Sequence, residues 1–438
     1  MATASDLVAP FDHGRTSTEW WRPVTPDPGS GIRDPKFVAG RRRAPAESSG
    51  SDVAFGALVA FTAILLLSPQ AWFPLLGTLR IAFLAAGVAI GAHLLDRLIR
   101  ARDVPPMPTE ILIALTLVAW AVLTLPLSYW PAGSVEVLAD RYLKAIAFFW
   151  LIGTIVTTTG RLRVLAWTLV LCSIPLAATG VKNYLAGEVL GTGVRGFTRI
   201  YGYMGGSSIA SNPNDLALML NLIIPIAAAL VWMSRRPAAR ALAAGALLLS
   251  VAAVIVTFSR AGFLALAASA LMFMAVLVRR RKAGVAAGLL VLALGALPLL
   301  PAGYVDRLST ITDVEADRTG SARGRWRDTR VAIGVVAQNP VVGVGIGQDI
   351  LAMNDERGIS TWRRVHNAYL QYGVDLGVPG LLLFVWLHVM CFRTARAVEV
   401  RTARDPALCH LAHLAAGVQV ALVVFGVEAL FHPIAYQF

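Results

Sequence analysis

The chain has 438 residues, of which 56% are hydrophobic and only 15% are charged, and its mean hydropathy is +0.64. A soluble globular protein carries about 25% charged residues, so this composition excludes an ordinary soluble domain. A net charge of +13 is typical of nucleic-acid binding in a soluble protein. Here the basic residues lie between apolar runs and no DNA- or RNA-binding motif interrupts them. The composition therefore predicts an all-α, polytopic membrane protein without a nucleic-acid partner.

The N-terminal 51 residues are polar, rich in Pro, Gly and Ser, and contain three consecutive arginines at 41–43. They lack the order of basic, apolar and small-residue regions that defines a signal peptide. We expect residues 1–51 to form a disordered cytoplasmic tail, whose basic end fixes the orientation of the first membrane span.

Apolar runs long enough to cross a membrane recur along most of the remaining chain. A helix rises about 1.5 Å per residue, so about 20 apolar residues cross a hydrocarbon core about 30 Å thick. We expect nine spans within residues 52–302 and two more within 378–438. The limits of these eleven spans are 52–69, 78–97, 109–128, 143–159, 163–183, 213–233, 240–258, 261–278, 283–302, 378–394 and 408–430.

The basic residues alternate between loops as the positive-inside rule requires. With a cytoplasmic N-terminus, every cytoplasmic loop is basic, whereas the alternate short loops are nearly bare of Lys and Arg. This pattern predicts that the C-terminus lies outside the cytoplasm. The basic residues of the cytoplasmic loops are Arg97, Arg100, Arg102, Arg161, Arg163, Arg235, Arg236, Arg240, Arg279, Arg280, Arg281, Lys282, Arg393, Arg396, Arg401 and Arg404.

Two of the predicted outside loops are long, at about 184–212 and 303–377. A loop as long as the second is uncommon without a role of its own. It contains a predicted helix over 321–338, with arginines in its first half and apolar residues in its second. We find no internal repeat, and therefore no sign of an inverted-repeat transporter.

Polar residues gather where these outside segments meet the membrane, which makes them functional candidates. In the segment 195–220, Arg199 precedes the sequence Asn-Pro-Asn-Asp, in which Asn212 or Asn214 can cap a helix and Asp215 falls in its first turn. Helix capping explains those residues as well as function does, but it does not explain Arg199.

Arg260 interrupts nearly forty apolar residues between two spans. A tight turn there needs small residues, which Ser259, Ala261 and Gly262 supply, and the positive-inside rule disfavours an arginine on this side. The alternative to function is a surface arginine whose charged end reaches the membrane interface.

The large loop carries several arginines and a histidine immediately before the tenth span. An arginine side chain binds phosphate through two parallel charged hydrogen bonds, and histidine exchanges a proton near neutral pH. This composition favours binding of a phosphate or diphosphate headgroup, and the alternative is a solvated basic helix. The residues are Arg323, Arg325, Arg327, Arg330, Arg363, Arg364 and His366.

Motifs of other chemistries are absent from the sequence. There is no P-loop and no HExxH zinc motif. The acidic residues of DVEAD at 313–317 fit no strong metal-site spacing, and Cys172, Cys391 and Cys409 form no CxxC pair, so we expect packing cysteines and no metal site.

Four segments, taken in order, resemble the O-antigen ligase and O-antigen polymerase superfamily of bacterial membrane glycosyltransferases. They are RIYGYMGGSSIASNPNDLAL, TFSRAGFLALAA, GRWRDTRVAIGVVAQNPVVGVGIG and HNAYLQYGVDLGVPGLLLF, within residues 195–385. The last is the most specific, because it combines His-Asn, an acidic residue, Gly and Pro-Gly leading into a span. The resemblance implies an all-helical membrane glycosyltransferase fold with a large periplasmic loop that carries the site.

The resemblance also implies the reaction and its partners. Such enzymes take an oligosaccharide from undecaprenyl diphosphate at the outer face of the bacterial inner membrane. They transfer it with inversion to a hydroxyl of a glycan or lipid A-core acceptor, without a nucleotide sugar, metal or other cofactor. Membrane lipids are a further expected partner, and the sequence leaves open whether a chain-length regulator binds.

Residue roles follow from the same resemblance. His366 is expected to be the general base, and Arg260 and Arg325 are expected to hold the diphosphate and stabilise its charge as it leaves. Substrate-binding candidates are Arg199, Arg323, Asp375, Asn367 and Asn214, of which the two asparagines also fit structural roles.

The sequence leaves the particular member of the superfamily open. A polymerase extends the lipid-linked chain, and a ligase transfers the finished chain to another acceptor. A transporter or flippase of lipid-linked oligosaccharides also needs arginines near a diphosphate, but it does not need a base at His366. A non-catalytic assembly partner is disfavoured by the intact set of Arg and His residues.

Overall fold

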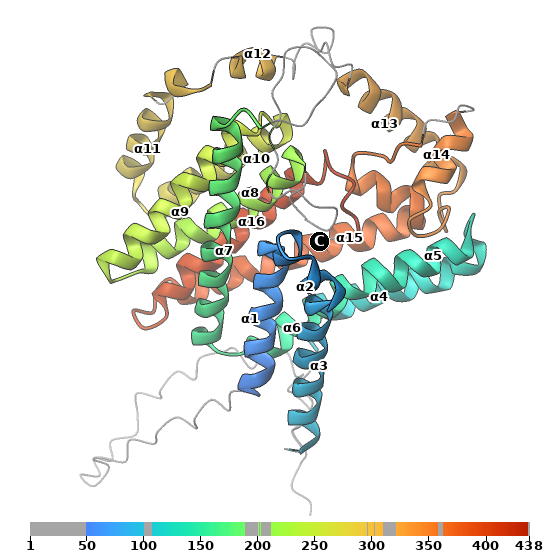
Figure 1. The fold of residues 1–438 in the computed structure, drawn as a ribbon, viewed down its shortest axis with the longest axis horizontal. Coiled ribbons are helices and arrows are strands. Elements are labelled where there is room, and N and C mark those ends of the chain that lie inside the picture. Colours follow the sequence, from blue (N-terminus) through green and yellow to red (C-terminus); the bar gives the residue numbers. More distant parts are fainter. Residues whose placement is uncertain are drawn as a thin grey trace, which may run out of the picture. The chain divides into compact units, whose positions relative to one another are not determined.

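The structure is a computed structural model that describes residues 50–99, 107–188, 200, 202, 212–295, 297–301, 303–309, 321–357 and 362–436. These residues form helices and no strand, which confirms the all-α prediction (Figure 1). The expected cytoplasmic tail lies outside the described residues, except for its last two positions.

The helices in chain order are α1 (Asp52–Leu67), α2 (Pro74–Thr78), α3 (Ile81–Ile99), α4 (Thr109–Thr124), α5 (Pro131–Val137), α6 (Leu143–Ile155), α7 (Thr159–Leu185), α8 (Pro213–Met233), α9 (Pro237–Val256), α10 (Arg260–Arg279), α11 (Ala283–Gly295), α12 (Tyr304–Ser309), α13 (Ser321–Gln338), α14 (Asp349–Arg357), α15 (Ala368–Thr402) and α16 (Cys409–Glu428). The 3₁₀ turns are η1 (Pro69–Ala71), η2 (Leu125–Leu127) and η4 (Leu297–Leu299), and η3 (Leu138–Tyr142) is a π-helix.

Eight helices in the described ranges are long and apolar enough to cross a membrane: α3, α4 continued by η2, α7, α8, α9, α10, α15 and α16. This finding confirms a polytopic membrane protein, but not the count of about eleven. Three expected spans correspond to shorter helices, namely α1 with 16 residues, α6 with 13 and α11 with 13. α1 ends where Ser68 adopts a left-handed conformation ahead of Pro69, and α6 follows directly on the π-helix η3.

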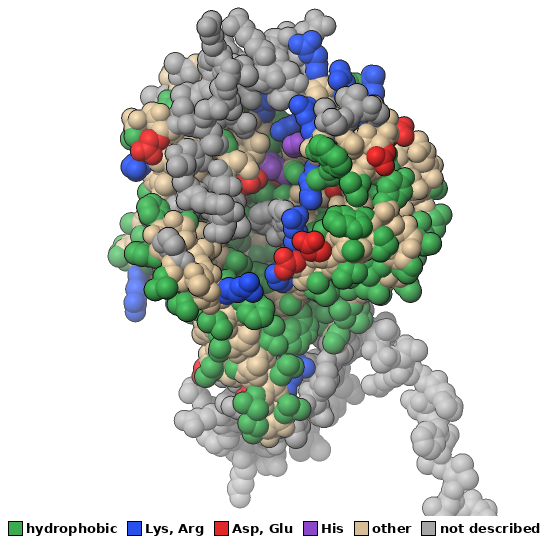
Figure 2. All heavy atoms as spheres, turned by 45° about the vertical axis from the view of Figure 1, so that its right-hand side comes forward, with side chains coloured by type: hydrophobic (Ala, Val, Ile, Leu, Met, Phe, Trp, Pro, Cys, Tyr) green, Lys and Arg blue, Asp and Glu red, His purple; other side chains and the backbone are tan. Residues whose placement is uncertain are grey.

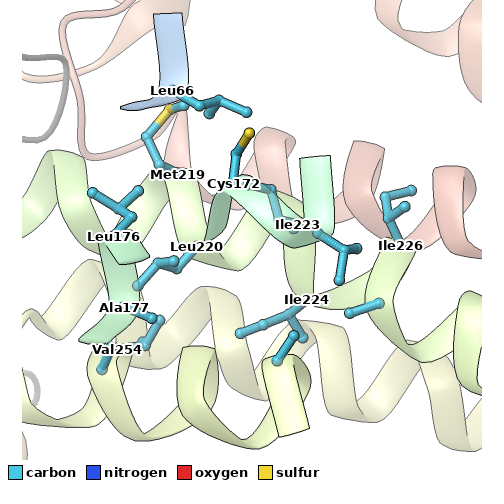
Figure 3. Close-up of a cluster of buried hydrophobic side chains, with 14 of the residues drawn as sticks. Leu66, Cys172, Leu176, Ala177, Met219, Leu220, Ile223, Ile224, Ile226 and Val254 are labelled. Atoms are coloured by element: carbon cyan, nitrogen blue, oxygen red, sulfur yellow. The ribbon is translucent and has the colours of Figure 1, made fainter. Parts of the chain in front are cut away.

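Helix α8 is the most buried of the eight, with 72% of its apolar window inside the protein. It packs against α7, α9, α10 and α16, as Figure 1 shows. Figure 3 shows the aliphatic cluster between these helices, with Leu220 and Ile224 of α8 facing side chains of neighbouring helices. A Cβ atom on Gly262 would lie 2.7 Å from Cβ of Ala217, so glycine is needed where α10 approaches α8.

Helix α15 is broken at Gly377, where φ is 68° and ψ is −173°, two residues before Pro379. The tenth span was expected to begin at 378, which is the point of this break. The helix continues in the N-terminal direction to Ala368, within what the sequence predicted to be loop. The predicted loop helix at 321–338 is confirmed as α13.

The two ends of the helices carry different kinds of residues. The first turns of α8 and α10 are joined by a hydrogen bond, and the amide of Ala368 at the start of α15 donates to the carbonyl of Ala429 after α16. At the other ends, the buried Glu399 of α15 pairs with Arg280 at the end of α10. Many of the arginines predicted to be cytoplasmic therefore lie at the end of the helices opposite to the starts of α8, α10 and α15.

Candidate active site

A cavity of about 520 Å³ lies where the starts of α8 and α15 meet the end of α16. Figure 2 shows histidine side chains in a hollow of the surface, with basic side chains beside them. The lining residues come from four segments that are far apart in the sequence. They are Arg141, Asn212, Pro213, Asn214, Asp215, Arg364, His366, Phe431, His432, Pro433 and Ile434.

The first turn of α8 forms one wall of this cavity. The side chain of Asn212 caps the helix by accepting from the amides of Asn214 at 2.9 Å and Asp215 at 3.0 Å. Its own amide group donates to the Asp215 carboxylate. The cap therefore fixes both the helix start and the side chains that line the cavity.

Arg260 begins α10, immediately after the residue that caps this helix. Ser259 accepts from the amide of Gly262 at 3.1 Å, and its hydroxyl donates to the side-chain oxygen of Asn214 at 2.9 Å. Arg260 is half-buried, so it is not a freely solvated surface arginine. The asparagine that lines the cavity thus holds the turn from which Arg260 projects.

His366 lies in the short segment before α15 and is partly buried. Its Nδ1 is 3.1 Å from the carbonyl oxygen of Arg364. A carbonyl only accepts, so this contact places the hydrogen on Nδ1 and leaves the Nε2 lone pair free to take a proton. Burial lowers the pKa of His366, and the positive charge of Arg325 lowers it further. The imidazole is therefore neutral at neutral pH, as a general base must be.

The segment that carries His366 is anchored on both sides. The side chain of Asn367 caps α15 by accepting from the amide of Leu370 at 3.1 Å. Val365 is fully buried in the cluster beneath α13 and α14. Asn367 thus has a structural contact that positions the neighbouring histidine.

Helix α13 brings one of its two candidate arginines toward the histidine. Arg325 is half-buried and its charge acts on His366, whereas Arg323 is exposed. The helix is held by a salt bridge from Arg357 of α14 to Asp328, at 2.6 Å, with both side chains almost fully buried. This buried pair holds α13 against α14.

Asp375 is fully buried and is not among the residues that line the cavity. Its Oδ2 accepts from the amide of Gly347 at 2.9 Å, and so holds residues 343–347, the glycine-rich loop before α14. Asp349 of α14 lies close enough to act on it, and burial raises the pKa of Asp349 to about 6. Arg199, the remaining candidate, lies outside the described residues.

Two polar lining residues, Arg141 and His432, are not among the candidates expected from the sequence, whereas Arg364 was expected among the loop arginines and Asp215 in the first turn of a helix. His432 is the most informative, because its Nδ1 lies 3.1 Å from Oε2 of the buried Glu428. Like His366, His432 lies at the predicted outer end of a span, so its position in the topology also marks it as a functional candidate.

One comparison with known proteins matches part of the chain that contributes to this site. Residues 245–385 match the O-antigen ligase family. The match contains Arg260, Arg325 and His366 and confirms the resemblance to the O-antigen ligase and polymerase superfamily. It supports a glycosyltransferase-like enzyme of O-antigen ligation or polymerisation, acting as a multi-pass membrane protein on a lipid-linked glycan. A search of curated proteins found no match.

Proposed function

We propose that this chain transfers an oligosaccharide from undecaprenyl diphosphate to a hydroxyl of an acceptor sugar, with inversion. The observation that carries the proposal is a neutral histidine in the wall of a cavity, with Arg325 acting on it and the turn of Arg260 tied to the same cavity. All three residues lie within the matched segment.

His366 is the general base in this reaction. Its Nε2 takes the proton of the acceptor hydroxyl as that oxygen attacks the anomeric carbon of the donor sugar. The bond from this carbon to the diphosphate oxygen breaks, and attack from the opposite face inverts the configuration. A positioned base of this kind contributes on the order of 10²–10⁴ in rate.

Arg260 and Arg325 stabilise the leaving group. Negative charge grows on the diphosphate as the glycosidic bond breaks, so fixed guanidinium groups bind the transition state more strongly than the ground state. They supply the positive charge that the leaving group needs, and the proposed reaction therefore uses no metal. Arg199 and Arg323 are proposed to contribute to donor binding.

The proposed location is the periplasmic face of the inner membrane. The cavity lies at the starts of α8 and α15, whereas Arg235 and Arg236 follow α8 and Arg279 ends α10. Because basic residues favour the cytoplasmic side, this distribution supports an outward-facing cavity. A cavity at the outer ends of the helices is accessible to a lipid-linked donor, whose diphosphate lies at the membrane surface.

The test is an assay with purified protein and undecaprenyl-diphosphate-linked repeat units, with and without lipid A-core. We expect product from the unaltered protein and a loss of at least about a hundredfold in His366→Ala and Arg260→Ala. His413→Ala, at the other end of α16, is the matched control and should retain activity. A ladder from donor alone indicates a polymerase, and product only with lipid A-core indicates a ligase.

Undiminished transfer by His366→Ala would refute the general-base role. Movement of the lipid-linked donor across liposome membranes, with no transfer product in any sample, would favour a flippase instead.

A further inference from the structure

His432 is a second histidine in the cavity that contains His366. The residue is 3% exposed and lines the cavity together with the first turn of α8. Its Nδ1 lies 3.0 Å from the main-chain oxygen of Glu428 and 3.1 Å from the carboxylate Oε2 of the same residue. Within the described part of the chain, its Nε2 is buried and has no hydrogen-bond partner.

The Glu428 carboxylate is fixed from the other side. It is fully buried, and its Oε1 accepts from the side-chain amide of Asn221 of α8 at 3.0 Å. The same amide group donates to the carbonyl of Gly262 in the first turn of α10, at 2.9 Å. A single asparagine therefore links the acid beneath His432 to the helix that begins with Arg260.

The charged groups around His432 favour its protonated form. Glu428 faces it from α16 and Asp215 from α8, while His366, Arg364 and Arg141 contribute the positive or titratable groups of the remaining walls. Burial acts to lower the pKa of His432, but the hydrogen bonds and charge of Glu428 outweigh it, and the pKa is raised. The two histidines of one cavity thus have pKa values displaced in opposite directions, an arrangement typical of acid and base pairs.

A protonated imidazole buried with one N–H unpaired needs an acceptor. An uncompensated buried donor is costly, and the strongest acceptor is an anionic oxygen. Arg141 and Arg364 line the same cavity and add positive charge, which favours an anionic ligand over a neutral sugar hydroxyl. The Nδ1 atom of His432 faces the main-chain and carboxylate oxygens of Glu428, so Nε2 is the atom that remains to bind the ligand.

We propose that His432 is a phosphate-binding residue of this cavity, whose Nε2–H donates to a diphosphate oxygen of the lipid donor while Glu428 fixes its ring. The inference rests on the proposed function and adds a residue to its leaving-group site. Its position after α16 places it outside the segment that matches the family.

The experiment measures binding of undecaprenyl diphosphate to the purified full-length protein, in the absence of any acceptor. The variants are His432→Gln, Glu428→Gln and, as a matched control, His413→Gln near the start of α16. A hydrogen bond to a charged group is worth on the order of tenfold or more in affinity, so we expect His432→Gln to bind at least about tenfold more weakly. His413→Gln should bind as the unaltered protein does.

The pH dependence separates binding from structural support. The affinity of the unaltered protein for undecaprenyl diphosphate should fall as the pH rises through the pKa of His432. The affinity is expressed relative to that of His432→Gln at the same pH, because titration of the ligand affects both proteins equally. Glu428→Gln retains the imidazole but removes the charge that raises its pKa, so the fall should move to lower pH. Folding of each variant is checked by thermal unfolding.

The outcomes distinguish the two proposals. Binding by the unaltered protein, with equal affinity and equal pH dependence in His432→Gln, would overturn the role of His432 and leave the proposed function intact. No binding of undecaprenyl diphosphate by the unaltered protein would overturn both. If His432→Gln does not fold, an unshifted pH dependence in Glu428→Gln is the result that overturns the inference.

Discussion

Ser259 and Asn214 join the first turns of α10 and α8 through a hydrogen bond of 2.9 Å between their side chains. Ser259 caps the helix that begins with Arg260, and Asn214 lines the cavity that contains His366. The bond therefore makes the position of a candidate phosphate-binding arginine depend on a residue that lies 46 positions earlier in the chain.

A double-mutant cycle tests this dependence. Asn214→Ala and Ser259→Ala should each lower the transfer rate, because either change releases the turn that carries Arg260. The double variant should lose less than the sum of the two losses, with a coupling energy of about 1 kcal/mol. If the two losses in activation free energy add without coupling, the hydrogen bond does not position Arg260.

The pH profile of transfer should report His366. A general base acts when it is unprotonated, and its pKa lies below the usual 6.5 because of burial and the charge of Arg325. The rate should therefore decline on acidification with a midpoint below pH 6.5. Arg325→Gln removes a nearby positive charge and should move this decline to higher pH, besides lowering the maximal rate. An unmoved decline would indicate that another group titrates.

The buried pair of Asp328 and Arg357 should stabilise the helices beside the cavity. Breaking such a pair removes the carboxylate that faces a buried guanidinium, and the expected loss in Asp328→Ala is about 3 kcal/mol. Faster amide hydrogen exchange across α13 is the measurement. Asp140→Ala is the control, because Asp140 forms an equally short but exposed pair with Lys144 and its loss should not change exchange measurably. Equal exchange in both variants would contradict this assignment.

Replacing Gly377 at the break in α15 should destabilise the protein. Its φ of 68° disfavours any other residue, and a Cβ atom would lie 2.6 Å from the main-chain carbon of Val341 and 2.8 Å from the oxygen of Pro340. Gly377→Ala should cost at least about 1–3 kcal/mol and lower the melting temperature. Gly91→Ala in α3, where a Cβ meets no atom within 4 Å, should be neutral or slightly stabilising.

Asp349 should make stability depend on pH. Burial raises its pKa from 3.8 to about 6, against the opposing charge of Arg364, so the native state favours the protonated acid. Its contribution is complete below about pH 4 and is lost as the pH rises through about 6. Asp349→Asn resembles the neutral acid and should melt above the unaltered protein at pH 7.5, with the difference vanishing near pH 4. A difference that does not vary with pH would refute this.

Several parts of the fold follow from local sequence. The arginines and turn residues around 321–338 predict α13, and the Asn-Pro-Asn-Asp sequence predicts the capped start of α8, because both signals act within a few residues. The break in α15 is harder to foresee. It depends on backbone contacts with residues 340–345, more than thirty positions earlier in the chain, that no local pattern encodes.

The candidate site divides in the same way. His366 and Arg260 stand out because charged or titratable groups next to apolar runs are costly. The position of Asp375 beneath the glycine-rich loop, and of His432 above Glu428, depends on how distant helix ends meet. Sequence motifs identify such residue types but do not show which of them share a cavity.

The break in α15 also has a consequence for motion. Four main-chain groups that a continuous helix would satisfy are bonded to other segments: Val374 O to the amide of Val344, Asp375 O to Gly345, Leu376 O to the Trp120 indole and the Val378 amide to Pro340 O. Lifting the glycine-rich loop away would strand buried polar groups in a poorly hydrated environment. We therefore expect the backbone around this break to stay in place while other parts of the cavity wall adjust to a ligand.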